Sequence, residues 1–162
     1  MHASRFESEA MPHMNDLFRT AARMAGERAG AEDLVQETYI RAWRSFHAFE
    51  PGANCRAWLF KILFCCVRHH RRKLFRSRLA KDELAGGGIL AALDKLPAEF
   101  RSVVLLVDVE EFAYQEVAGI LGIPIGTVVS RLSRGRKVLR GYLAEAVDEY
   151  RIEACTESKQ GL

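Results

Sequence analysis

The sequence lacks the long apolar runs that a membrane-spanning helix requires. No stretch approaches the roughly 18 consecutive apolar residues that reach across a bilayer, and the N-terminal segment has acidic residues where a secretory signal has its apolar core. Cysteine is also scarce. Of the four cysteines, Cys65 and Cys66 are adjacent and cannot bridge each other without strain. We therefore expect no signal peptide, no membrane insertion and a location in the reducing cytoplasm.

The sequence also lacks a recognisable set of catalytic residues. No serine, cysteine or lysine stands in a nucleophile motif, and there is no glycine-rich phosphate-binding loop. Cys65 and His69 are four residues apart, as are Cys66 and His70, so each pair would share one face of a helix. Two ligands from one helix do not complete a tetrahedral site. We predict that the protein is not an enzyme and holds no metal or cofactor.

What the sequence does contain is two blocks of positive charge. Residues 51–81 include nine Lys or Arg and no Asp or Glu, and residues 123–143 include five and again no acid. Residues 82–122, between the two blocks, have eight acids against two bases. The formal net charge of +3 hides this alternation. Two separate basic blocks predict two contacts with a polyanion such as DNA, although solvated helix faces would give a similar pattern.

Hydrophobic residues recur at helical spacing along the whole chain, without sustained period-two alternation. Val35, Tyr39, Ala42, Trp43 and Phe46 are predicted to form one buried stripe. The first expected helices are 14–25, 31–46 and 56–78, with a break at 26–30. After a glycine triplet at 86–88, helical structure restarts near 91, with Pro97 in a first turn, and continues in helices 114–121 and 126–146. We predict an all-α fold with two small helical domains, 1–78 and 92–146, a flexible linker at 79–91 and a tail at 147–162.

Residues 113–139 have the pattern of a helix-turn-helix. Gly122 suits a helix C-terminus, and Pro124 leads into the next helix. If Val128, Leu132 and Leu139 are buried, the exposed face of the second helix can enter a DNA major groove, where arginine contacts guanine or phosphate. A plain helical hairpin is the alternative. The residues predicted to face DNA are Thr127, Val129, Ser130, Arg131, Ser133, Arg134 and Lys137.

Two segments resemble one known family. Residues 92–139, which end in GIPIGTVVSRLSRGRKVL, are similar to region four of sigma factors, the module that reads the minus-thirty-five promoter element and touches the polymerase flap. Residues 31–63, which begin AEDLVQETYIRAW, resemble region two. The order of the two modules is that of the small extracytoplasmic-function (ECF) sigma factors. The resemblance implies three partners: core RNA polymerase, promoter DNA and an anti-sigma protein.

The resemblance to region two also implies two sets of site residues. The residues expected to dock on the clamp helices of the largest polymerase subunit are Asp33, Leu34, Gln36, Glu37, Ile40, Arg41 and Arg44. The residues expected at the minus-ten element, where stacking and basic side chains hold opened DNA, are Phe49, Asn54, Arg56, Trp58, Lys61, Arg68, Arg71 and Arg72. Helical spacing by itself favours a core position for Trp58.

Two other functions remain open from the residues alone. The chain could be a stand-alone DNA-binding regulator that uses only its helix-turn-helix, or a thiol- or metal-based sensor centred on Cys65 and Cys66. The sequence also departs from the family pattern at Phe64 and Cys65, at Val129, and at Ala113, where the loss of a serine N-cap costs about 1 kcal/mol. These departures affect the preferred promoter sequence more than the class of function.

Overall fold

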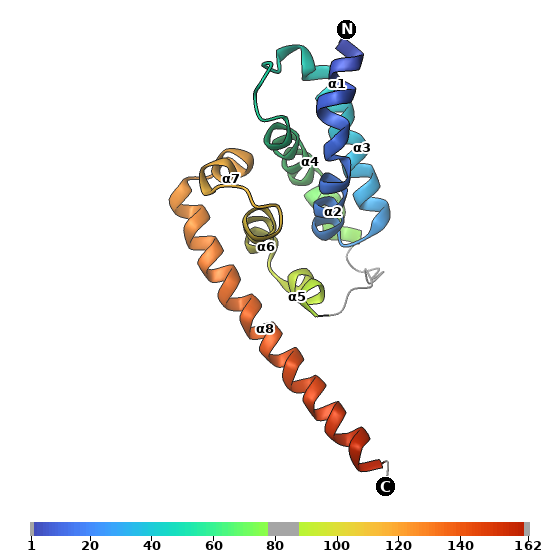
Figure 1. The fold of residues 1–162 in the computed structure, drawn as a ribbon, viewed down its shortest axis with the longest axis vertical. Helices are drawn as coiled ribbons and strands as arrows, with labels where there is room; N and C mark the ends of the chain where they lie inside the picture. The colour runs from blue at the N-terminus through green and yellow to red at the C-terminus, as the bar shows by residue number, and fades with distance from the viewer. Residues whose placement is uncertain (1, 78–87, 161–162) are drawn as a thin grey trace.

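The computed structural model describes residues 2–77 and 88–160, and every regular element within these ranges is a helix (Figure 1). The N-terminal group comprises α1 (His2–Ala10), η1 (Met11–His13), α2 (Met14–Ala25), α3 (Arg28–Ser45), η2 (Phe46–Ala48) and α4 (Cys55–Ser77). The C-terminal group comprises α5 (Ile89–Lys95), α6 (Ala98–Val104), the π-helical turn η3 (Leu105–Val109), α7 (Tyr114–Leu121) and α8 (Ile125–Gln160). The all-α prediction is confirmed.

Helices α2, α3 and α4 form the core of the N-terminal group. Leu17, Leu34, Leu59 and Leu63 are fully buried between them. Helix α2 has the predicted bounds and ends at Gly26, whose left-handed φ of 76° lets its N–H bond to the Ala22 carbonyl. The predicted break at 26–30 is too long, because α3 begins at Arg28 and includes a buried glycine. Packing of an 18-residue helix outweighs the roughly 1 kcal/mol cost of that glycine.

The buried face of α3 is rotated from the predicted one. Ala42 and Phe46 are buried as expected, but Trp43 is 49% exposed, so its assignment to the buried stripe is wrong. Residues advance by about 100° around a helix. Both α2 and α4 pack on α3, so the middle of its buried face lies near Thr38 and Ala42. Trp43 lies at the edge of that face, where neither helix covers it fully.

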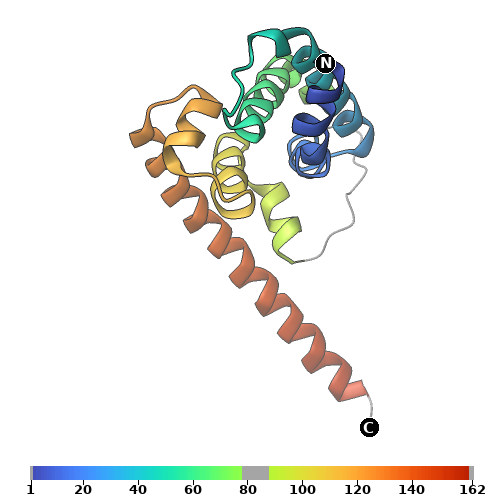
Figure 2. The ribbon, with the colours of Figure 1, turned by 45° about the horizontal axis from the view of Figure 1, so that its top comes forward.

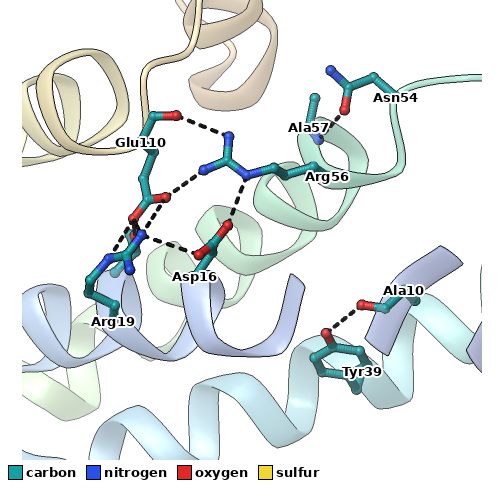
Figure 3. Close-up of polar contacts among 9 residues, drawn as sticks. Ala10, Asp16, Arg19, Tyr39, Asn54, Arg56, Ala57 and Glu110 are labelled. Atoms are coloured by element: carbon teal, nitrogen blue, oxygen red, sulfur yellow. Dashed lines mark hydrogen bonds and ion pairs between the residues drawn. The ribbon is translucent and has the colours of Figure 1, made fainter. Parts of the chain in front are cut away.

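Helix α1 was not predicted from the sequence. It is short, but it closes one end of the N-terminal core. Phe6 lies edge-on to Trp43 and Phe46, with ring centroids 5.1 Å apart in each pair. The Tyr39 hydroxyl donates a hydrogen bond to the Ala10 carbonyl at 2.8 Å, which fixes the end of α1 against α3 (Figure 3).

The C-terminal group differs from prediction at both ends. Helix α5 starts at Ile89, so part of the predicted linker is helical; residues 79–87 lie outside the described residues. Helix α7 has the predicted bounds. Helix α8 does not end at Ala146 but continues to Gln160, and its last turns project away from the rest of the protein (Figures 1 and 2). No glycine or proline occurs between Tyr142 and Gln160, so nothing in that stretch stops the helix.

The two groups of helices pack against each other, which the sequence did not indicate (Figure 2). Their buried hydrophobic residues form one continuous cluster, in which Phe60 of α4 meets Phe112 edge-on at 5.1 Å. Buried Arg101 donates hydrogen bonds to the Leu93 and Leu96 carbonyls and, across the boundary, to the Arg23 carbonyl at 3.0 Å. Arg23 in turn pairs with Asp94 at 3.1 Å.

Among the described residues, no single helix has the length and apolar composition to cross a membrane. One pair, α7 with α8 up to Glu149, meets that test only when the two are counted together, and the pair is bent by 102°.

Glu111 lies in the left-handed region, with φ 58°, in the loop before α7. An L residue there costs about 1–2 kcal/mol, whereas glycine adds about 0.5–1 kcal/mol of entropy cost on folding. We expect Glu111→Gly to raise the free energy of unfolding by about 0.5–1 kcal/mol in urea denaturation. Glu111→Ala, which keeps a Cβ atom, is the control and gives no gain. Equal effects of the two substitutions would contradict this account.

Candidate functional site

The outward face of α8 is built by the turn that precedes it. Gly122 adopts φ 64°, and the Ile123 N–H bonds to the Ala118 carbonyl at 3.2 Å, which ends α7. Gly135 lets α8 lie close to α6, because a Cβ atom there would stand 3.0 Å from Val104 Cγ2. Val128 and Leu132 are buried beneath. The predicted DNA-facing residues that are exposed are Val129, Ser130, Ser133, Arg134 and Lys137, while Thr127 and Arg131 are half-buried.

A second outward surface is an apolar hollow between α2 and α3. It is lined by Met14, Phe18, Val35, Tyr39, Ile40 and Trp43, with Glu32, Gln36 and Arg44 among the polar residues around it. Ile40 and Trp43 are each almost half exposed. Apolar side chains exposed together within a polar rim are typical of a protein-docking site. We refer to this surface as the α3 hollow.

The α3 hollow contains only part of the predicted polymerase-docking set. Gln36, Ile40 and Arg44 line it, and Asp33 is exposed on the same helix. Leu34 is 1% exposed and belongs to the core, so it cannot serve as a surface contact. Trp43 was missed as a surface residue because the helical pattern placed it in the buried stripe.

Glu37 and Arg41 lie at the edge of α3 that faces α4. Arg41 Nη2 contacts Glu37 Oε1 at 2.5 Å, and the other carboxylate oxygen of Glu37 contacts His70 Nε2. The hydrogen bond from His70, with smaller contributions from Arg41, lowers the pKa of Glu37 and keeps it ionised at neutral pH. These two predicted docking residues are therefore already held by partners within the protein.

The predicted minus-ten residues divide between exposed and engaged side chains. Lys61 and Arg71 are exposed on α4; the side chain of Arg72 lies outside the described residues. Asn54 caps α4 by accepting the Ala57 N–H at 3.0 Å (Figure 3). The amide of Asn54 donates to Glu116 of α7 at 3.1 Å. Arg68 donates to the Leu121 carbonyl at 3.0 Å.

Arg56 points away from solvent, into the boundary between the two groups of helices. Its guanidinium contacts Asp16 at 3.1 Å, the carboxylate of Glu110 at 2.5 Å and the main-chain carbonyl of Glu110 at 3.0 Å (Figure 3). The same guanidinium lies 4.4 Å from the centroid of the Phe112 ring. In this conformation Arg56 is not available to a DNA phosphate.

Phe49 does not stand on the surface as a base contact would require. It is 6% exposed. Its ring stacks on Phe46, with centroids 5.7 Å apart, and is tilted against Trp58, with centroids 4.8 Å apart. The 3-10 turn at Phe46–Ala48 folds the chain back and returns Phe49 to the core. The expectation that Phe49 contacts a base is wrong for this conformation. Trp58 is only partly buried and packs against the edge of the core.

Two of the cysteines, Cys55 and Cys66, are poorly suited to a sensor. Burial raises the pKa of Cys55 to about 11 and also raises the pKa of Cys66, so both thiols stay protonated at neutral pH. Within residues 2–77 and 88–160, no three His, Cys, Asp or Glu side chains are grouped so that they could hold a metal ion. The thiol- or metal-sensor alternative gains no support.

Comparison with known proteins gives a consistent result. Residues 10–76 match the family "Sigma-70 region 2", and residues 87–139 match "Sigma-70, region 4". The chain is 37% identical over 157 residues to the ECF RNA polymerase sigma factor SigE of Mycolicibacterium smegmatis, covering 85% of this chain and 61% of that relative. It is 36% identical over 142 residues to the ECF RNA polymerase sigma factor EcfG of Rhodopseudomonas palustris, covering 76% of each.

A solved structure has the same architecture. The sigma factor RpoE of Bartonella quintana, in complex with the anti-sigma factor NepR, superposes with a TM-score of 0.72 at 32% identity. The match covers 86% of this chain and 97% of that one.

The positions of Phe49 and Trp43 predict unequal effects on stability. Phe49→Ala leaves a cavity in the core and is expected to lower the free energy of unfolding by about 3–5 kcal/mol. Trp43→Ala removes a half-exposed ring and is expected to cost about 1 kcal/mol. Chemical denaturation of both variants measures the difference. A larger loss for Trp43→Ala than for Phe49→Ala would contradict the observed packing.

Proposed function

Since this chain belongs to the sigma-70 family and has the region two and region four layout of the ECF sigma factors, we propose that it binds core RNA polymerase and directs promoter-specific transcription initiation. Its own residues supply docking and DNA contacts, while the chemistry of RNA synthesis remains with the polymerase. The protein acts in the cytoplasm, where polymerase and promoter DNA are found. An anti-sigma protein controls it, by analogy with the Bartonella relative that is seen with NepR.

The α3 hollow is the observation that carries this proposal. A stand-alone regulator needs only the outward face of α8, so it has no use for a second exposed apolar surface on another helix. Ile40 and Trp43 supply apolar anchors, and Gln36 and Arg44 supply a polar rim, as in protein interfaces. We propose that the hollow receives the clamp helices of the largest polymerase subunit.

The outward face of α8 supplies the minus-thirty-five contacts in this proposal. Residues 127–137 include four Lys or Arg and no acid. A helix of this kind fits the major groove, where arginine reads guanine and grips phosphate. Lys61 and Arg71 offer a basic track on α4 for the opened minus-ten strands. Region two then comprises the helices up to α4, and region four begins at α5.

A matched pair of substitutions tests the division between the two surfaces. Ile40 and Val129 are exposed to a similar extent on different helices. Ile40→Asp is expected to weaken binding to core polymerase 10- to 100-fold, as for an interface anchor. Val129→Asp introduces the same charge and should leave that affinity unchanged. Titration of labelled protein with purified core polymerase measures both. Equal losses for the two variants would refute the assignment of the hollow.

The complementary prediction concerns Arg131 and Arg134. A promoter is first selected from random DNA duplexes with the wild-type holoenzyme. Replacing both arginines with alanine should weaken binding of the holoenzyme to that promoter. Affinity for core polymerase should be unchanged. The logarithm of the promoter-binding constant falls linearly with the logarithm of the salt concentration. The magnitude of this slope should decrease by about 0.9 for each phosphate that these arginines neutralise in the wild type. Wild-type protein without polymerase is the control: tight, specific duplex binding by it alone would favour the stand-alone regulator.

A further inference from the structure

We infer that, in the free protein, Glu110 holds region four against region two and keeps Arg56 from binding DNA. We call this intramolecular contact the latch. This inference rests on the proposed function for the identity of the ligand, but the latch itself is a property of the chain. Glu110 precedes α7 in region four, and all its side-chain partners come from α2 and α4 of region two (Figure 3).

The carboxylate of Glu110 is 1% exposed and fully engaged. Arg19 Nη2 reaches both of its oxygens, at 3.0 and 3.1 Å, and Thr20 Oγ1 donates to Oε1 at 3.1 Å. Arg56 Nη2 donates to Oε2 at 2.5 Å. Asp16 accepts from Arg19 at 3.2 Å and from Arg56 at 3.1 Å, so two acids and two arginines balance each other. We call these four residues with Thr20 the Glu110 cluster.

A carboxylate is unfavourable where its charge is neither paired nor hydrated, so Glu110 restricts the ways in which region four can pack on region two. If region four shifted on region two, Glu110 would lose both guanidinium groups and its hydroxyl donor together. Contacts on either side reinforce the same closed arrangement: Phe112 packs on Phe60, and Asn54 bonds to Glu116. The cluster therefore specifies the closed arrangement rather than merely tolerating it.

The closed arrangement affects the proposed surfaces unequally. The α3 hollow and the outward face of α8 remain open, as the exposure of Ile40 and Arg134 shows. Arg56 is covered, and Asn54 and Arg68 are bonded to region four. The latched protein can therefore dock on polymerase, but it cannot present the complete minus-ten surface.

Promoter geometry requires that the latch opens. The minus-thirty-five and minus-ten elements are about 25 base pairs apart, or roughly 85 Å at 3.4 Å per base pair. In the closed form Asn54 of the minus-ten surface is hydrogen-bonded to α7, the helix that leads directly into the outward face of α8. Two surfaces so close together cannot read both elements on one duplex. Release of Glu110 is therefore a step between docking and promoter opening.

The test compares full-length wild-type protein with Glu110→Gln, the double variant Glu110→Gln/Arg56→Ala, and Glu149→Gln. The last is a charge-matched control on the projecting part of α8. Small-angle X-ray scattering gives the radius of gyration, and amide hydrogen exchange gives the protection of α7. A salt titration with fluorescein-labelled single-stranded DNA of mixed sequence gives affinity and the number of phosphate contacts.

For Glu110→Gln we expect a larger radius of gyration, faster exchange in α7 and several-fold tighter binding of the labelled strand. The slope of the logarithm of the binding constant against the logarithm of salt concentration should steepen by about 0.7 for each phosphate that Arg56 and Arg68 are then free to bind. The double variant should stay open and lose the part of the change in slope that comes from Arg56, about 0.7. Glu149→Gln should behave as wild type. The inference is overturned if Glu110→Gln stays closed. It is also overturned if Glu110→Gln opens but has the same slope as the double variant, because Arg56 then binds no phosphate.

Two further measurements keep the outcome unambiguous. If Glu110→Gln does not fold, as judged by circular dichroism, Arg19→Met weakens the latch through a side chain that is 53% exposed. It should raise exchange in α7 in the same direction, and unchanged exchange overturns the inference. Binding of wild-type protein to core polymerase is measured in parallel. Its absence would refute the proposed function, while the opening measurements would still decide the existence of the latch.

Discussion

The pairing of one buried carboxylate with two guanidinium groups determines how the two halves of this protein are arranged. While the boundary between the two halves is buried, an unpaired ion at the position of Glu110 would cost several kcal/mol, so the packed arrangement is one in which Arg19 and Arg56 reach Glu110. The alternation of charge along the chain thus has a structural meaning. The acidic segment 82–122 meets the beginning of the basic block 51–81 within the folded protein. Glu110 of region four occupies Arg56, a basic group of region two that the proposed function assigns to DNA.

In the proposed function, this arrangement separates polymerase docking from DNA binding. The α3 hollow is apolar and open, and so suits a protein partner whatever the state of the cluster. The minus-ten surface is polar, and part of it is satisfied internally by Glu110, Glu116 and the Leu121 carbonyl. An exposed apolar side chain without a partner costs only about 25 cal/mol per Å² of its surface, whereas a buried charged group without a partner costs several kcal/mol. That difference explains why the same closed structure leaves one surface ready and the other covered.

Much of the local structure could be read from the chain. Helices α2 and α7 were predicted with their observed bounds because each ends at a glycine that adopts a left-handed conformation, Gly26 and Gly122. The outward residues of the second helix of the helix-turn-helix were also identified, because Val128 and Leu132 define its buried side. Prediction failed where the signal was weak. Helix α1 buries only Phe6 and Ala10, which is too few residues to show a clear period, and α8 passes Ala146 without a stop signal.

By itself, the sequence determined the helical class, the turn between α7 and α8, the two blocks of positive charge and the family resemblance. Each of these depends on neighbours along the chain, through hydrogen bonds four residues apart, left-handed glycines and the spacing of apolar side chains. Only the tertiary structure decided that Phe49 is core, that Trp43 is surface and that Arg56 faces Glu110. The period of a helix shows that it has a buried face, but the elements that pack on it decide which residues that face includes.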